Sequence, residues 1–225
     1  MYMKRLNIIT GHYGSGKTEF AINYALRLKE VFGSATICDM DIVNPYFRTN
    51  DATDFLTDNG IKVIAPEYAC TNLDLPSLPS DIFSVFADKE TPAVLDVGGD
   101  EEGAIALGQY YPYIKDEDYE MFFVINAKRP DTQDAESILK LAYEIEASSR
   151  CKITALVNNT NLSYLSSADD FDGSFELIDE VSQKLGVPVK HVSATPEVLA
   201  KLKGVSEETR FPLKLFMHLP FDALA

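Results

Sequence analysis

Gly11-His12-Tyr13-Gly14-Ser15-Gly16-Lys17-Thr18 matches the phosphate-binding loop pattern of Gly, four residues, Gly, Lys and then Ser or Thr. The glycines let successive backbone N–H groups point into one concavity, which binds an anion. We expect the amine of Lys17 to reach the β- and γ-phosphates, and the hydroxyl of Thr18 to ligate Mg²⁺. All eight residues are therefore predicted to bind a nucleotide.

The residues on either side of this loop support the prediction. Residues 6–10 (LNIIT) form a short apolar run, which is typical of a buried strand. After Thr18, apolar residues recur at helical spacing as far as Gly33, a residue type that commonly ends a helix. A strand, the loop and a helix in this order place the positive end of the helix at the phosphates.

Composition indicates a globular protein that forms one α/β domain over residues 1–225. Hydrophobic residues make up 46% and charged residues 24% of the chain, and no apolar stretch reaches the 18 or so residues of a membrane span. Because the first predicted strand begins near Met1, we expect no signal peptide. The three cysteines show no paired spacing. We therefore expect a cytoplasmic protein.

The formal net charge of −15 limits the possible partners. An acidic surface repels nucleic-acid backbones and anionic membranes, so we expect neither as a partner. It does not exclude ATP, because the loop N–H groups and Lys17 create a local positive potential.

Apolar segments alternate with helical patterns, which predicts a mostly parallel sheet of seven or eight strands between two helix layers. Strands are expected at residues 6–10, 35–38, 61–65, 93–97, 121–125, 153–157 and 187–192, and helices near 135–145 and 175–185. Asp131 is expected to cap the first of these helices. Residues 67–80 read as a loop that could form a lid or a partner surface. The tail 210–225 could add a strand or a packed helix.

Polar residues follow several of these strands, at the sheet edge where ligands bind in open parallel sheets. Asp96 ends an apolar strand as a Walker B carboxylate does, and Gly98 and Gly99 would let the backbone approach the γ-phosphate. We expect Asp39 and Asp41, two residues apart at the end of their strand, to point to opposite sides, with one serving the metal and the other orienting the attacking water.

The predicted catalytic residues are thus Lys17, Asp39 and Asp41, and the predicted metal ligands are Thr18, Asp39 and Asp96. The loop after the fifth strand, residues 126–129 (NAKR), lacks the aspartate of the Asn-Lys-x-Asp guanine motif. The amide of Asn158 could bond an adenine edge. We therefore expect ATP and Mg²⁺ as the bound groups, with ATP preferred over GTP.

With these residues assembled, the chain resembles the nucleotide-binding domain of the MinD/ParA, Mrp, CobQ/CobB and nitrogenase iron-protein ATPases. The resemblance is carried by residues 11–18, by 39–41 through Asn44 and Pro45, by 95–99 and by 157–158. It implies that Asp39 and Asp41 coordinate water and Mg²⁺, that Asn158 touches adenine, and that the Asp96 strand neighbours the loop strand.

The chain departs from that family at His12. Most MinD/ParA members carry there a second lysine that reaches across an ATP-sandwiched dimer. Arg48 or Arg129 could supply the missing charge.

The sequence leaves three functions open. The first is a slow Mg²⁺-dependent ATPase switch, in which segments 39–49 and 96–103 respond to the nucleotide and are read by an unknown protein partner or by a homodimer. The second is an ATP-dependent enzyme of the CobQ or dethiobiotin-synthetase kind, with loop 67–80 and Arg48 binding a small acidic substrate. The third, a GTPase metallochaperone, is disfavoured by the missing guanine motif and metal ligands.

Overall fold

A computed structural model describes residues 3–41, 53–65 and 80–216 of the protein. Within them lies one sheet of eight strands in the order β3-β2-β4-β1-β5-β6-β7-β8, and every neighbouring pair is parallel. The strands are β1 (Leu6–Gly11), β2 (Ala35–Asp39), β3 (Ile61–Ile64), β4 (Ala93–Asp96), β5 (Tyr119–Ile125), β6 (Ala155–Asn158), β7 (Val189–Ala194) and β8 (Arg210–Pro212).

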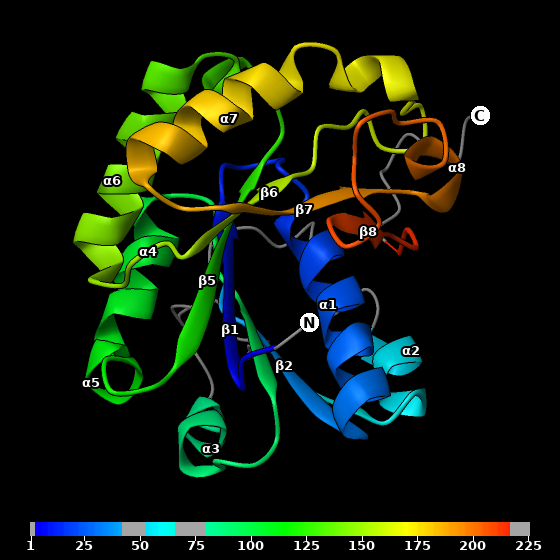
Figure 1. The fold of residues 1–225 in the computed structure, drawn as a ribbon. Coiled ribbons are helices and arrows are strands. Elements are labelled where there is room, and N and C mark those ends of the chain that lie inside the picture. Colours follow the sequence, from blue (N-terminus) through cyan, green and yellow to red (C-terminus); the bar gives the residue numbers. More distant parts are fainter. Residues whose placement is uncertain (1–2, 42–52, 66–79, 217–225) are drawn as a thin grey trace, which may run out of the picture.

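Helices cover both faces of this sheet, so the predicted three-layer α/β fold is confirmed (Figure 1). The first face carries α1 (Lys17–Phe32) and α2 (Thr53–Asp58). The opposite face carries α3 (Ile82–Ala87), α4 (Glu101–Gln109), α5 (Tyr111–Ile114), α6 (Ala135–Ser149) and α7 (Ser174–Leu185). Two short 3₁₀ turns, η2 (Pro130–Thr132) and η3 (Ala168–Phe171), and the short helix α8 (Pro196–Leu199) lie in connections between strands.

Burial on both faces explains why the strands read as continuous apolar runs. On the α1 side, Phe20, Tyr24 and Leu28 of the helix pack on Ile9, Phe122 and other strand residues that are fully buried. Burying each such side chain stabilises the fold by roughly 1.5–3 kcal/mol relative to leaving it exposed. The strands nearest the loop are therefore held firmly in place.

The predicted strand positions agree with the structure to within two residues at most ends, and the tail supplies the eighth strand, one of its two expected forms. The predicted cap of α6 was wrong. Asp134, not Asp131, accepts the Ser137 backbone N–H at 2.8 Å, because Asp131 lies in the 3₁₀ turn η2 and Asp134 is the residue directly before the helix.

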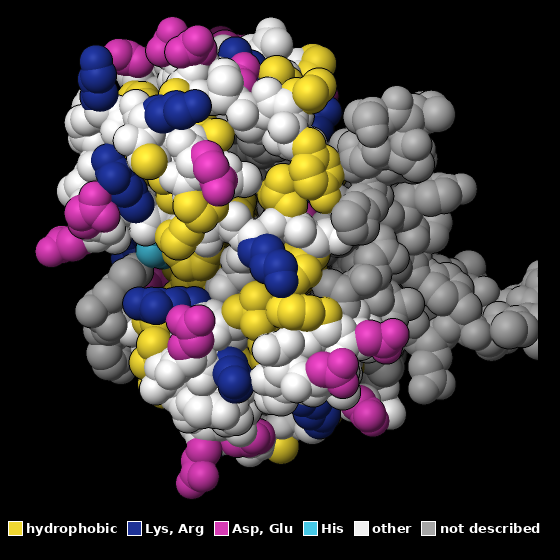
Figure 2. Space-filling model, turned by 90° about the vertical axis from the view of Figure 1, so that its right-hand side faces the viewer, with side chains coloured by type: hydrophobic (Ala, Val, Ile, Leu, Met, Phe, Trp, Pro, Cys, Tyr) yellow, Lys and Arg dark blue, Asp and Glu magenta, His cyan; other side chains and the backbone are white. Residues whose placement is uncertain are grey.

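The segment after β8 lies along α1. The side chain of Asn23 donates to the Lys214 carbonyl at 2.9 Å and accepts the Lys214 N–H at 2.8 Å, which is the pairing that a neighbouring strand would supply. The Phe216 N–H donates to Glu19 at 2.5 Å, and its ring lies 4.9 Å from that of Phe55 in α2. Figure 2 shows the surface on this side, where acidic and basic side chains are interspersed.

Among the described residues, no helix is long and apolar enough to cross a membrane.

Candidate functional site

The phosphate-loop sequence connects a buried strand to a long helix, as its pattern predicts. Strand β1 ends at Gly11, and the 16-residue helix α1 begins at Lys17. Gly16 precedes the helix with φ 83°, and no side chain caps it. The N–H groups of the first helical turn have no partner within their own helix, which makes this end suited to an anion. The Ser15 hydroxyl is also buried without a hydrogen bond.

Lys17 sits among carboxylates. Its side chain is only 7% exposed, and burial lowers the pKa of its amine, while the charges of Asp96, Asp41 and Asp100 act in the opposite direction. These acidic residues favour the charged amine in the folded protein. The structure thus brings together Lys17 and the two aspartates Asp41 and Asp96 that were predicted from separate strands.

Asp39 and Asp96 end adjacent strands. They are direct partners across the parallel β2–β4 pair, and both are buried. Strand β4 lies between β2 and β1, so the expectation that the Asp96 strand neighbours the loop strand is confirmed.

The expectation that Asp39 and Asp41 point to opposite sides of a continuing strand was wrong, because side chains two residues apart in a strand lie on the same face and the strand does not reach Asp41. Strand β2 ends at Asp39, whose carboxylate accepts the Asp41 N–H at 2.9 Å. This local bond turns the chain, a common property of aspartate. A Cβ added to Gly98 would lie 3.4 Å from the Asp41 carboxyl carbon, so Asp41 faces the turn after β4.

The turn after β4 contacts the phosphate loop through Gly99. A Cβ at this position would lie 2.7 Å from the Lys17 amine, 2.7 Å from the Tyr13 nitrogen and 2.8 Å from the Gly11 carbonyl oxygen. Any side chain would push the two segments apart. Helix α4 then begins with Asp100 as its cap, accepting the Gly103 N–H at 2.9 Å.

Asn158 does not present its amide to a nucleotide. It is 1% exposed, its nitrogen donates to the Ser174 hydroxyl at 3.0 Å, and its oxygen accepts the Thr160 hydroxyl at 2.8 Å. The expected contact with adenine is therefore not supported by this arrangement. The amide is engaged because α7 begins beside the end of β6.

The next residue, Asn159, holds the phosphate loop and was not predicted to do so. Its side-chain nitrogen donates to the Ser15 carbonyl at 2.7 Å, and its oxygen accepts the Ser193 hydroxyl of β7 at 2.8 Å. A Cβ on Gly16 would lie 2.3 Å from that nitrogen. The position of Asn159 directly after a strand indicated that it lies at the ligand-binding end of the sheet. The sequence did not indicate its partner, because Ser15 is 144 residues away.

Two residues of the loop after β5 also contact the phosphate loop. The Arg129 Nε donates to the Gly14 carbonyl at 2.9 Å, and Asp131 Oδ2 lies 3.4 Å from His12 Nε2. The other ring nitrogen of His12 donates to the Tyr13 carbonyl at 2.9 Å. His12 is thus held toward the acidic Asp131.

The residues present suit Mg²⁺. Buried carboxylates of Asp39 and Asp96 and a hydroxyl of Thr18 are oxygen donors, the ligand type that Mg²⁺ prefers. Within the described ranges no group of three or more His, Cys, Asp or Glu side chains forms a metal site. A metal here would therefore rely on two carboxylates, the hydroxyl and nucleotide phosphates.

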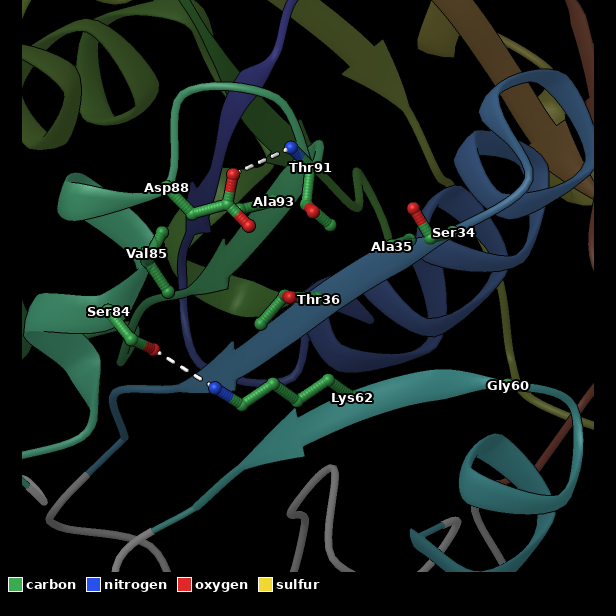
Figure 3. A pocket seen from close by; sticks show the side chains of 10 residues that line it. All are labelled: Ser34, Ala35, Thr36, Gly60, Lys62, Ser84, Val85, Asp88, Thr91 and Ala93. Atoms are coloured by element: carbon green, nitrogen blue, oxygen red, sulfur yellow. Dashed lines mark hydrogen bonds between the residues drawn. The ribbon is translucent and has the colours of Figure 1, made fainter.

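A separate hollow of about 280 Å³ lies near the amino ends of the strands, on the side of the sheet away from the phosphate loop (Figure 3). It is lined at the amino ends of β2, β3 and β4 by residues that include Thr36, Lys62 and Asp88, and the Lys62 amine donates to the Ser84 hydroxyl at 3.1 Å. None of its lining residues belongs to the phosphate loop.

Part of the predicted site lies outside the described residues. This applies to residues 42–49 of the first switch-like segment, with Asn44, Pro45 and Arg48, to residues 67–79 of the loop, and to the tail from residue 217.

No protein-family model and no curated protein matches the sequence. Solved structures do match. The cell division protein FtsY of Thermotoga maritima has a TM-score of 0.60 at 15% identity, covering 85% of this chain and 62% of that one. FtsY from Elizabethkingia anophelis in complex with GDP has a TM-score of 0.53 at 15% identity, covering 86% and 57%. The signal recognition particle 54 kDa protein of Aeropyrum pernix, in complex with GDP, has a TM-score of 0.52 at 15% identity, covering 85% and 41%.

These likenesses show the fold, which is that of the P-loop NTPases. The chain spans about three fifths of the length of the two FtsY structures and about two fifths of the 54 kDa protein. They agree with the fold predicted from the sequence and do not show that the chain belongs to the MinD/ParA family.

Proposed function

We propose that this protein binds a nucleoside triphosphate with Mg²⁺, hydrolyses it slowly and acts as a nucleotide-controlled switch. The observation that carries the proposal is the meeting of three features at one sheet edge: an uncapped helix N-terminus after the phosphate loop, the buried Lys17, and the adjacent Asp39–Asp96 pair. Phosphate and Mg²⁺ together suit this combination of N–H donors, a cation and carboxylates.

Each residue has a role in this proposal. Lys17 and the loop N–H groups hold the β- and γ-phosphates. Thr18, Asp39 and Asp96 hold Mg²⁺, which supplies positive charge to the phosphates. Asp41, on the turn after β2 and near Gly98, orients the attacking water.

ATP is the proposed nucleotide, although two of the similar structures contain GDP. The preference rests on missing guanine contacts. Neither residues 126–129 (NAKR) nor residues 158–161 (NNTN) contain the Lys-x-Asp pair of the guanine motif. Because the Asn158 amide is engaged, the base contacts must come from other groups.

The switch is proposed to use the turn after β4. Gly99 contacts the Lys17 amine and the loop backbone in this structure. A γ-phosphate held by Lys17 needs part of the same space, so a triphosphate and a diphosphate would leave the turn in different positions. Segment 39–49 is proposed to respond in the same way, and a second copy of the chain or another protein would read the difference.

The experiment that tests this function combines hydrolysis and mass. We expect ATP–Mg²⁺ to be hydrolysed slowly without any added substrate. Asp41→Ala should lower the rate by about 10²–10⁴-fold, the typical contribution of a group that accepts a proton from the attacking water. Asp179→Ala, an exposed carboxylate of α7, is the matched control and should leave the rate unchanged.

Light scattering then measures the mass of the Asp41→Ala protein. Doubling with ATP–Mg²⁺ but not with ADP–Mg²⁺ supports a dimer switch. An equal mass with both nucleotides contradicts the dimer. Turnover that requires an added small carboxylate supports instead the alternative enzyme, whose proposed substrate residues lie outside the described part of the chain.

A further inference from the structure

The loop that follows β5 is attached to the phosphate loop at Gly14. The Arg129 Nε donates to the Gly14 carbonyl, although the two residues are 115 positions apart in the sequence. The loop itself is fixed by its own bonds: the Thr132 hydroxyl donates to the Asn126 carbonyl at 2.6 Å, and the Arg129 N–H donates to the same carbonyl at 3.1 Å. The backbone that carries Arg129 is therefore held in place.

The guanidinium of Arg129 packs against the backbone of Gly14. A Cβ added to Gly14 would lie 2.9 Å from Nε, 3.1 Å from Cζ and 3.3 Å from Nη2, and the φ of Gly14 is +73°. A side chain at position 14 is thus disfavoured both by the backbone and by the arginine. This close approach places the two terminal nitrogens of Arg129 at the rim of the phosphate loop.

Those terminal nitrogens form no hydrogen bond or ion pair with the part of the chain that the structure describes. The contrast with the preceding residue is clear, because the Lys128 amine lies 3.4 Å from a carboxylate oxygen of Asp170. The chain has 35 acidic residues against 20 Lys and Arg residues, so a basic side chain could readily find an acidic partner. Arg129 instead directs one N–H to a backbone carbonyl of the phosphate loop.

We propose that Arg129 contacts the terminal phosphate of the bound nucleotide in cis. This inference rests on the proposed function. The Nε bond to Gly14 orients the guanidinium, and the remaining N–H donors form a planar fork that matches phosphate oxygens. Lys17 reaches the site from the start of α1, and Arg129 reaches it from the loop after β5, so the two cations act on the triphosphate from different elements.

A contact with the terminal phosphate gives a result that a purely structural role does not. We expect Arg129→Ala to weaken binding of a non-hydrolysable ATP analogue with Mg²⁺ about tenfold more than binding of ADP–Mg²⁺, as measured by titration calorimetry. The rate of ATP hydrolysis should fall at least as much. Arg129→Lys should restore only part of the difference, because a lysine lacks the planar fork.

Lys128→Ala is the matched control, because it removes the neighbouring cation of the same loop and should leave the ratio of the two affinities unchanged. Arg129→Ala that weakens both nucleotides equally, or that behaves as Lys128→Ala does, overturns the inference. Failure of the unaltered protein to bind either nucleotide overturns the proposed function itself, so the two failures are distinguishable. Melting without nucleotide shows whether Arg129→Ala is folded, and Arg129→Lys tests the same contact with the cation retained.

Discussion

Lys17→Ala is expected to remove most of the stabilisation that ATP–Mg²⁺ confers. At 100 times its dissociation constant, a ligand that binds only the folded state stabilises it by about 2.7 kcal/mol. For a chain of this size, that corresponds to a melting shift of about 5–11 °C. The shift should nearly vanish in the variant, because the buried amine is the cation placed within the phosphate loop. Thermal unfolding with and without ATP–Mg²⁺ measures it.

The two proteins must be compared by the change in melting temperature that ATP–Mg²⁺ causes, and not by the melting temperature alone. Removing Lys17 leaves Asp96, Asp41 and Asp100 without their central cation, so the protein without nucleotide also changes in stability. Arg27→Ala is the matched control, since this residue is an exposed cation of the same helix that pairs with Glu30. An equal shift in Lys17→Ala and Arg27→Ala would show that the nucleotide binds elsewhere.

The stability of the fold is expected to fall in mild acid because of His191. Its ring is 2% exposed, and it lies among aromatic rings, with centroids 5.1 Å from Phe211, 5.6 Å from Phe122 and 5.9 Å from Phe20. Burial lowers the pKa of His191 to about 4, and the charge of the adjacent Lys190 acts in the same direction, whereas Glu120 opposes it. The neutral ring is the form that this cluster accommodates.

The sign follows from the two pKa values. Between pH 6.5, the value of a free histidine, and pH 4, the unfolded chain binds more protons at this position than the folded one. The contribution of His191 is therefore complete above pH 6.5 and is lost as the pH falls toward 4. Going from pH 7.5 to pH 5 should cost about 2 kcal/mol of unfolding free energy, since one pKa unit equals about 1.4 kcal/mol.

Urea unfolding at these two pH values checks the effect. We expect His191→Phe, which suits the aromatic cluster, to lose about 2 kcal/mol less than the unaltered protein over that interval. Tyr24→Phe alters the same cluster without changing a group that titrates there, and should keep the full dependence. Identical pH dependence in all three proteins would show that His191 is not the responsible group.

Local sequence patterns predicted the features of this site that depend on neighbours in the chain. The strand, loop and helix around Lys17 form one continuous segment, and Asp96 ends an apolar strand, so spacing alone located both. The parallel order of β2, β4 and β1 then brings Asp39 and Asp96 together at the loop. The alternation of strands and helices predicted the parallel sheet, and the resemblance to the MinD/ParA-type ATPases implied that the Asp96 strand neighbours the loop strand.

Features that depend on distant contacts could not be predicted in this way. The bonds of Asn159 to Ser15 and of Arg129 to Gly14 each join segments more than a hundred residues apart. The turn at Asp39 was missed for another reason, because a side chain that bonds its own backbone competes with strand extension. The sequence shows that an aspartate can form such a bond, but it does not show whether the chain turns at Asp39 or continues as a strand.

The most direct test of nucleotide binding at the phosphate loop is a titration of the labelled protein with ATP–Mg²⁺, followed by the NMR signals of the backbone amides. We predict that the signals of residues 14–18 shift most, with those of Arg129 and Gly99 following. Signals of Lys62 and Ser84, in the hollow near the amino ends of the strands, should remain in place. Shifts centred on that hollow, or no shift in residues 14–18, would contradict the account.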